Sequence, residues 1–287
     1  MSADYFFRMG KTHTICQDYA IAGSRTYKMD DEVGTFQYAI LSDGCSGKPD
    51  PNDPGSPYTD FGARFLTRAA QKNLKEVPWL STLPADRILA EAESMARAAS
   101  LPQCALDATL LVAVAAEKYA RTFQFGDGVV VSRERGTGKL EYKTRKFGDN
   151  MPYYLSYTSS FARQCDYKDK AKTVTTIRGF TDENGIWSRR ETTTGLEDLK
   201  KDAGESIYSR EDTDLILLLS DGAESFFDAA GNEVPLETVL TELMNFKNYS
   251  NAFVKCRCDW FFKTTCENNG WVHKDDFSMA GIFWEAP

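Results

Sequence analysis

Three strand-like apolar segments of this chain adjoin aspartates. In chain order, these are Asp43-Gly44, Asp221-Gly222 and Asp275-Asp276. An apolar segment of about five residues bounded by glycine is typical of a buried strand. Carboxylates gathered at one rim of a sheet would repel one another unless a cation neutralised them. The pattern therefore predicts a site for hard metal ions.

Oxygen ligands select Mg²⁺ or Mn²⁺ over softer metals. Two such ions about 4 Å apart can bind a phosphate and ionise a bridging water, which then attacks phosphorus in line. The alternative for any single Asp-Gly is an ordinary tight turn. Repetition after strand-like segments favours the metal site. The candidate ligands are Asp18, Asp43, Asp127, Asp221 and Asp275.

The composition excludes some classes of protein. A net charge of −8 argues against a general binder of nucleic acid or of anionic membranes. No apolar segment approaches the roughly 20 residues of a membrane span. Seven cysteines at irregular spacing do not form a disulfide framework, and residues 1–10 lack a signal-peptide pattern. We therefore expect a cytoplasmic protein in a reducing compartment.

Zinc is not predicted. The chain has two histidines, and Cys256, Cys258 and Cys266 lack the paired spacing of structural zinc sites. We expect these cysteines to be small buried residues on a helix near Trp260. A metal or redox role is the alternative.

Several elements can be placed around the aspartates. Residues 35–42 predict a strand, with residues 14–23 as a hairpin partner, and residues 45–60 predict a loop rich in proline and glycine. Thr59 or Asp60 could cap the helix that follows.

The rest of the chain alternates between helices and strands. A helix over residues 84–100 would have Pro84 at its first position. Residues 122–125 and 129–131 resemble a β-hairpin around Gly126-Asp127-Gly128. Residues 139–210 are polar and predict short strands and a surface excursion. Further strands are expected over 108–115, 215–219 and 280–284, and further helices over 235–246 and 251–266. The sequence shows no clear domain boundary. This order of strands and helices predicts an α+β fold.

The motifs, taken in order, resemble the metal-dependent protein phosphatases of the protein phosphatase 2C type, in a bacterial branch. They are Gly10-x-x-His13-x-x-Cys16-Gln17-Asp18, Ser42-Asp43-Gly44, Asp107-Ala108-Thr109, Phe125-Gly126-Asp127-Gly128, Leu219-Ser220-Asp221-Gly222 and Asp275-Asp276-x-Ser278. The resemblance implies a four-layer α-β-β-α sandwich with two central, mostly antiparallel sheets. It also implies a single catalytic domain over residues 1–287, with a variable flap within 139–210.

The resemblance further implies a centre of two or three Mn²⁺ or Mg²⁺ ions. Asp43 would bridge two ions, and the Gly44 carbonyl would bind one of them. Asp221 and Asp275 would hold the other ion, with Asp276 as the substitute if the register differs by one.

Two more aspartates have implied roles. Asp18 would hydrogen-bond metal-bound waters, and Asp127 would help to bind a weaker third ion. Three departures concern the remaining machinery: Gln17 stands where many members have Glu, His13 where many have a phosphate-binding Arg, and Cys45 where eukaryotic members have a His.

His13 could bind the substrate phosphate or donate a proton, because nearby carboxylates should raise its pKa. The alternative is a structural histidine. Cys45 could be an exposed thiol or a small buried filler. Arg64 and Arg68 could replace the missing clamp or could be ordinary surface charges.

These features predict a serine/threonine phosphoprotein phosphatase that opposes a kinase and attacks phosphate with a metal-bridging hydroxide. Gln17, His13 and Cys45 leave open a binding or regulatory module that has lost turnover. A phosphatase or phosphodiesterase for a small phosphate ester is the third reading.

Overall fold

Two antiparallel sheets form the middle of the protein. The computed structural model describes residues 1–29, 32–45, 58–74, 83–170, 173–195 and 204–285. The seven-stranded sheet has the order β1 (Ser2–Arg8), β14 (Phe277–Phe283), β11 (Thr213–Leu219), β6 (Val129–Glu134), β7 (Leu140–Phe147), β8 (Thr173–Thr181) and β9 (Trp187–Gly195). The five-stranded sheet has the order β10 (Ser206–Ser209), β5 (Tyr119–Phe125), β4 (Leu110–Ala115), β3 (Glu32–Asp43) and β2 (Asp18–Met29). A small third sheet pairs β12 (Phe226–Phe227) with β13 (Val272–His273).

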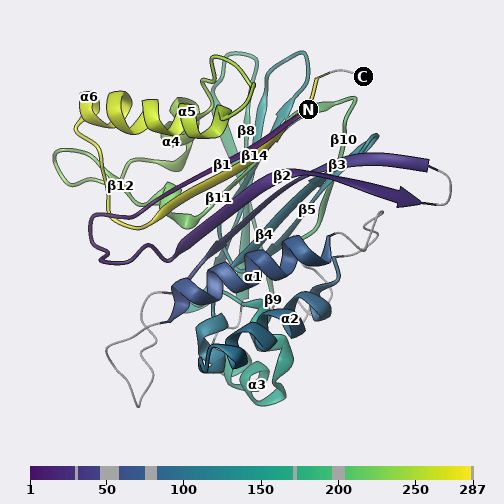
Figure 1. Ribbon diagram of the computed structural model, residues 1–287. Coiled ribbons are helices and arrows are strands. Elements are labelled where there is room, and N and C mark those ends of the chain that lie inside the picture. Colours follow the sequence, from purple (N-terminus) through teal and green to yellow (C-terminus); the bar gives the residue numbers. More distant parts are fainter. Residues whose placement is uncertain (30–31, 46–57, 75–82, 171–172, 196–203, 286–287) are drawn as a thin grey trace.

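Helices cover the outer face of each large sheet (Figure 1). On the five-stranded sheet these are α1 (Thr59–Asn73) and α2 (Ala85–Ala98). On the seven-stranded sheet they are α4 (Leu236–Leu243) and α5 (Phe253–Trp260), which continues through a π-helix (Phe261–Cys266) into α6 (Glu267–Asn269). The expected four-layer α-β-β-α sandwich is confirmed.

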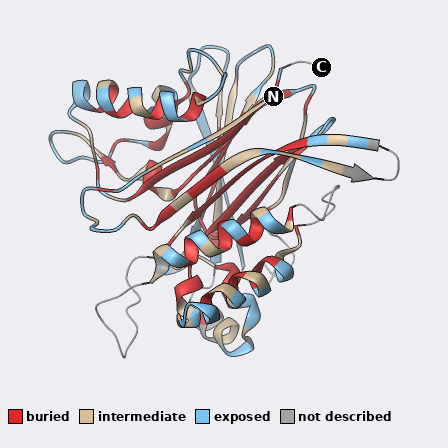
Figure 2. Ribbon diagram, in the orientation of Figure 1, coloured by how far each residue is buried: buried red, intermediate tan, exposed pale blue. Residues whose placement is uncertain are grey.

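Three apolar clusters hold the layers together, and the strands between the helices are the most buried part of the molecule (Figure 2). Leu66 of α1 and Ile88 of α2 pack against Ile40 of β3. On the other side, Leu240 and Val254 pack against the seven-stranded sheet. Between the sheets the cluster is rich in alanine, so the two layers can approach closely. None of the described helices is long and apolar enough to cross a membrane.

The predicted elements are mostly present, with shifted ends. The strand β3 and its partner β2 form the expected hairpin, but β2 begins at Asp18. The helix α1 has Tyr58 in a left-handed conformation at its N-cap, so neither Thr59 nor Asp60 caps it. Pro84 is the N-cap of α2 and not its first helical residue. The predicted loop 45–60 lies mainly outside the described residues.

The expected hairpin around Gly126-Asp127-Gly128 is wrong. The strand β5 pairs with β4 and β10, whereas β6 pairs with β7 and β11, so the two strands belong to different sheets. Gly126 and Gly128 have φ values of 84° and 106°, a region that favours glycine. These three residues therefore carry the chain from one layer to the other, with Asp127 at the crossing.

The segment 139–210 is more regular than expected. Much of it forms β7, β8, β9 and β10. Between β7 and β8 the chain leaves the sheets in two short 3₁₀ helices and α3, with bounds η2 (Gly148–Asn150), η3 (Leu155–Ser159) and α3 (Phe161–Lys170). Elsewhere in the described residues, 3₁₀ helices occur at η1 (Gln103–Leu106) and η5 (Asp221–Glu224).

The C-terminal cysteines are only partly as expected. Cys258 and Cys266 are buried on the helix, but Cys256 is exposed. None of the seven cysteines, all of which lie in the described residues, is part of a disulfide.

Candidate metal centre

The five-stranded sheet places two of the predicted residues directly opposite each other. Asp18 begins β2 and Asp43 ends β3, and the two are paired in the antiparallel register. The backbone of Asp43 is fixed by Thr109: its N–H donates to Thr109 Oγ1 at 2.9 Å, and its carbonyl accepts from Thr109 N at 2.8 Å. Gly44 follows with an N–H that donates to the Gln17 carbonyl at 3.2 Å. Both strand ends are therefore held firmly at this rim.

The seven-stranded sheet brings two further aspartates to its rim. Leu219 of β11 pairs with Val129 of β6. Asp221 comes two residues after β11 and Asp127 two residues before β6, so both lie beyond the same end of this pair, and the charge of Asp221 acts on Asp127. Asp127 is 9% exposed and Asp221 is partly buried. The rim thus receives carboxylates from β2 and β3 and from the residues next to the ends of β6 and β11.

The pKa values show that these carboxylates share one environment. Burial raises the pKa of Asp18 to about 7, while hydroxyls of Ser220 and Ser278 oppose the rise. Burial, followed by the charges of Asp18 and Asp221, holds the pKa of Asp43 well above its usual range.

The same causes act on the other sheet. Burial and the charge of Asp221 raise the pKa of Asp127 to about 8. Burial and the charge of Asp275 raise the pKa of Asp221. The five predicted aspartates are therefore electrostatic neighbours, contributed by both sheets.

The donor set fits hard cations. Both carboxylate oxygens of Asp18 and one of Asp221 are buried and have no well-oriented hydrogen bond to any of the described residues. Buried anionic acceptors without a partner are costly, and a cation would relieve that cost. As the side chains lie, the described residues include no group of three or more His, Cys, Asp or Glu that forms a ready metal cluster. The carboxylates are thus neighbours at one rim and not a closed coordination shell.

Asp275 and Asp276 have different surroundings. Asp276 is 2% exposed and accepts the N–H groups of Gly10 at 2.7 Å and Gln17 at 2.5 Å. A side chain at Gly10 would come within 2.3 Å of the Asp275 backbone, so this position requires glycine. Asp275 is 39% exposed in its side chain and acts on the pKa of Asp221. The geometry favours Asp275 as the ligand and Asp276 as the residue that holds the opening motif in place.

His13 lies on the acidic pair. Its Nδ1 is 3.0 Å from Asp276 Oδ2 and its Nε2 is 3.4 Å from Asp275 Oδ1. Burial lowers the pKa of His13, but its bond to Asp276 and the charges of Asp276, Asp275 and Asp18 outweigh that effect and raise it. His13 is therefore at the site, and it is engaged with carboxylates.

The remaining candidates from the sequence are Cys45, Arg64 and Arg68, and each has its own surroundings. Cys45 is partly buried, and its N–H donates to the Asp107 carbonyl at 2.9 Å. It also interacts with Tyr154, whose pKa is raised mainly by burial and then by Cys45. The guanidinium groups of Arg64 and Arg68 lie over the Tyr19 ring, at 5.2 and 5.6 Å.

Two charged contacts near the rim were not anticipated. Lys146 Nζ forms an ion pair with Glu224 Oε2. Arg163 of α3 donates to both carboxylate oxygens of buried Asp107, at 2.5 and 2.7 Å. Both pairs join residues more than 50 positions apart within segments that have little sequence periodicity. No local signal in the sequence indicates them.

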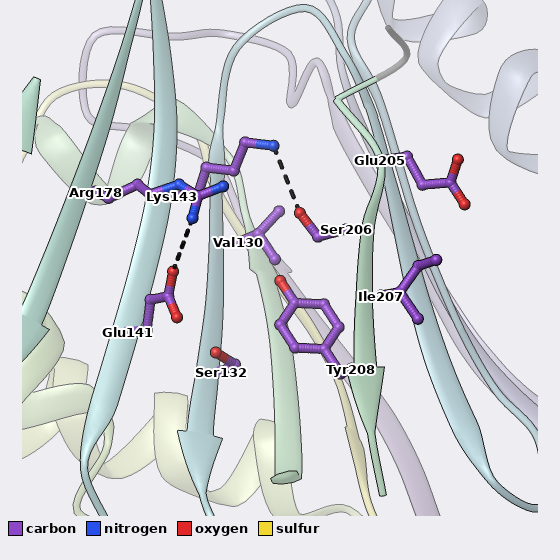
Figure 3. Close-up of a pocket in the computed structure, with 9 residues that line it drawn as sticks. All are labelled: Val130, Ser132, Glu141, Lys143, Arg178, Glu205, Ser206, Ile207 and Tyr208. Carbon is purple, nitrogen blue, oxygen red and sulfur yellow. Dashed lines mark hydrogen bonds and ion pairs between the residues drawn. The ribbon is translucent and has the colours of Figure 1, made fainter. Parts of the chain in front are cut away.

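A separate cavity of about 290 Å³ lies between strands of the two sheets (Figure 3). It is lined by residues from β6, β7, β8 and β10, among them Lys143, Glu141 and Arg178. Lys143 points toward Ser206, and their Nζ and Oγ atoms are 3.5 Å apart. None of the predicted site residues lines this cavity, so the carboxylate rim and not this cavity is the candidate site.

Comparison with known proteins agrees with this fold. A family model described as protein phosphatase 2C matches residues 10–255. No curated protein sequence matches the chain. A variant of a bacterial serine phosphatase superposes with a TM-score of 0.52 at 13% identity, over 99% of each chain, and shows the same fold.

Two other solved structures are more distant in shape. The serine/threonine phosphatase Stp1 from Staphylococcus aureus gives a TM-score of 0.46 at 13% identity, over 99% of this chain and 95% of that one. The catalytic domain of the serine threonine protein phosphatase PstP, in complex with two manganese ions, gives 0.48 at 13% identity, over 99% and 98%. Since the family model spans most of its length, this chain belongs to the protein phosphatase 2C family, and hence to the phosphoric monoester hydrolases.

Proposed function

We propose that this protein is a metal-dependent serine/threonine phosphoprotein phosphatase of the cytoplasm. The observation that carries the proposal is the rim of five neighbouring aspartates, contributed by both sheets, with buried carboxylate oxygens that lack partners. Its substrates would be proteins phosphorylated by a Ser/Thr kinase.

In this proposal Asp43, the Gly44 carbonyl, Asp221 and Asp275 hold two Mn²⁺ or Mg²⁺ ions, and Asp127 helps to hold a third. When bound, such ions supply a hydroxide nucleophile at neutral pH and neutralise charge on the phosphate. Oxygen-only donors suit these metals and not zinc.

The protein's own groups have distinct tasks. Asp18 would accept hydrogen bonds from metal-bound waters, since its two oxygens are buried and have no well-oriented hydrogen bond to the described residues. The carboxylate neighbours of His13 raise its pKa, which favours the protonated form that can donate a proton or a hydrogen bond next to the ligands. Asp276 fixes the segment 10–17 beneath them.

The first experiment is hydrolysis of a phosphothreonine peptide with Mn²⁺, with Mg²⁺ and with a chelator. Wild type should be active only with metal. Asp43→Ala and Asp221→Ala should abolish activity while remaining folded. A nucleotide monophosphate tested in parallel identifies a small-molecule phosphatase if it is the better substrate.

The altered residues Gln17, His13 and Cys45 favour one other function, a binding module without turnover. Folded protein that binds Mn²⁺ but shows no hydrolysis with any metal would contradict the phosphatase and support that module.

A further inference from the structure

We infer that Lys146 binds the phosphate group of the substrate. It would replace the phosphate-binding arginine of many family members, whose position is occupied here by His13. This inference rests on the proposed phosphatase function. Lys146 lies on β7, and β7 pairs with β6 so that Thr144 faces Val129. Lys146 is two residues beyond this last pair, on the side where Asp127 precedes β6, and its charge acts on Asp127. A cation thus flanks the row formed by Asp127 and Asp221.

The ion pair with Glu224 supports this position independently. Glu224 ends the 3₁₀ turn that Asp221 begins, and residues three apart in a 3₁₀ helix lie above one another. Because Lys146 Nζ contacts Glu224 Oε2, its ammonium lies against the turn that carries a proposed metal ligand. The charge of Lys146 also lowers the pKa of both Asp127 and Asp221, against the larger upward effect of burial.

Lys146 is accessible to a ligand. Its side chain is 47% exposed, whereas that of Glu224 is 22% exposed. An ion pair this open to water contributes little to stability. A phosphate dianion carries more charge than a carboxylate and accepts stronger charge-assisted hydrogen bonds. The ammonium can therefore exchange Glu224 for phosphate at little cost.

Other described cations near the site are engaged elsewhere. Arg163 makes its bidentate contact with Asp107, which is 1% exposed. Arg145 is buried and donates to the Gln124 carbonyl at 3.3 Å. Arg64 and Arg68 are stacked on Tyr19. Releasing Arg163 would strand the buried Asp107 carboxylate, and releasing Arg64 or Arg68 would break their stacking on Tyr19. Moving Lys146 breaks only an ion pair that water can reach.

The test compares wild type with Lys146→Met, Lys146→Arg and a matched control, Lys143→Met. Lys143 lies on the same strand, but its ammonium contacts Ser206 and the Gly204 carbonyl in the separate cavity. Two probes are used with Mn²⁺ present: inorganic phosphate, followed by calorimetry, and a phosphothreonine peptide, followed by kcat and KM. Mn²⁺ affinity and thermal unfolding are measured for every variant, and Lys146→Gln is the second neutral substitution.

Lys146→Met should weaken phosphate binding and raise KM by roughly 10- to 100-fold, as expected for the loss of one charged hydrogen bond. Mn²⁺ affinity should be unchanged or tighter, because a cation beside the carboxylates is removed. Lys146→Arg should retain phosphate binding within about threefold, since the charge is kept. Lys143→Met should behave as wild type. A purely structural role would lower the unfolding temperature without this selective loss.

The outcomes separate the inference from the proposed function. An active wild type whose phosphate affinity and KM are unchanged by Lys146→Met overturns the inference and leaves the phosphatase standing. An inactive wild type that still binds phosphate through Lys146 overturns the phosphatase and supports the inference. If folded, Mn²⁺-loaded wild type shows neither hydrolysis nor phosphate binding, both the inference and the proposed function are overturned.

Discussion

The two sheets build their halves of the rim differently. The five-stranded sheet contributes Asp18 and Asp43, which face each other across β2 and β3. The principal charged neighbours of Asp43 are other carboxylates. The seven-stranded sheet contributes Asp127 and Asp221 together with Lys146 and Glu224. The sheet residues of the first group are carboxylates only, and we call it the anionic half; those of the second group carry both signs, and we call it the mixed half.

The difference separates two tasks that a phosphatase must perform. A metal dication requires concentrated negative charge, but a phosphate dianion is repelled by it. Carboxylates of both halves can hold metal, while the lysine of the mixed half receives the anion. The asymmetry predicts that substitutions of the carboxylates and of Lys146 will affect different steps.

The largest effect should come from the anionic half. Asp43→Asn should reduce kcat by about a thousandfold or more, because metal ions contribute several kcal/mol of transition-state stabilisation. The metal-free variant should unfold at a higher temperature than wild type, since repulsion at a buried site is relieved. Activity assays and thermal unfolding with chelator check the two effects. Retained activity with lower stability would remove the distinction between the halves.

Asp275 and Asp276 should give opposite results although they are adjacent. Asp276→Ala leaves the Gly10 and Gln17 N–H groups unpaired and should cost about 3–5 kcal/mol in the free energy of unfolding. Asp275→Ala should change that free energy little and reduce Mn²⁺ affinity and kcat. Denaturant unfolding and calorimetry measure both. The reverse pattern would make Asp276 the ligand.

The raised pKa values of the rim predict how stability depends on pH. Asp18 and Asp127 have pKa values of about 7 and about 8 in the folded protein, so they bind protons more tightly in the folded state than in the unfolded state. Metal-free protein should therefore lose the stability from these groups as the pH rises from about 4 to about 8. Thermal unfolding at pH 5.5 and 8, with chelator, should show the decrease, and Asp18→Asn should reduce it. Mn²⁺ should restore stability at pH 8. An increase with pH in the chelated protein would contradict the shared environment.

The smallest effect should come from Glu224→Gln. It removes the partner of Lys146 but keeps the shape of the turn, so phosphate should bind up to about threefold more tightly. Product inhibition by inorganic phosphate measures this change. Weaker phosphate binding would show that Glu224 positions Lys146 and does not compete for it.

Much of the site could be predicted because it lies in short local motifs. Asp43 and Asp221 each follow an apolar strand, and this adjacency is visible in the sequence. The crossing from one sheet to the other at Asp127 could not be predicted. Two short strands joined by Gly-Asp-Gly have the same sequence pattern whether they pair with each other or belong to different sheets. Lys146 could not be found either, because its position depends on the register between β6 and β7.

The role of Asp276 was inaccessible for another reason. Its contacts with Gly10 and Gln17 join residues that are 266 and 259 positions apart. The family pattern could suggest which of the two acidic residues binds metal, but only the fold shows what the other one does.

The position of β14 between β1 and β11 also bears on how the protein is made. This strand ends at residue 283 and lies next to the edge strand of the sheet, which begins at residue 2. Such distant pairing is slow because the loop must close before any contact forms. During synthesis on the ribosome, the Asp276 anchor and β14 emerge after every other part of the rim. A nascent chain therefore cannot assemble the site, and its apolar strands β1 and β11 remain unpaired on that side until synthesis has passed this point.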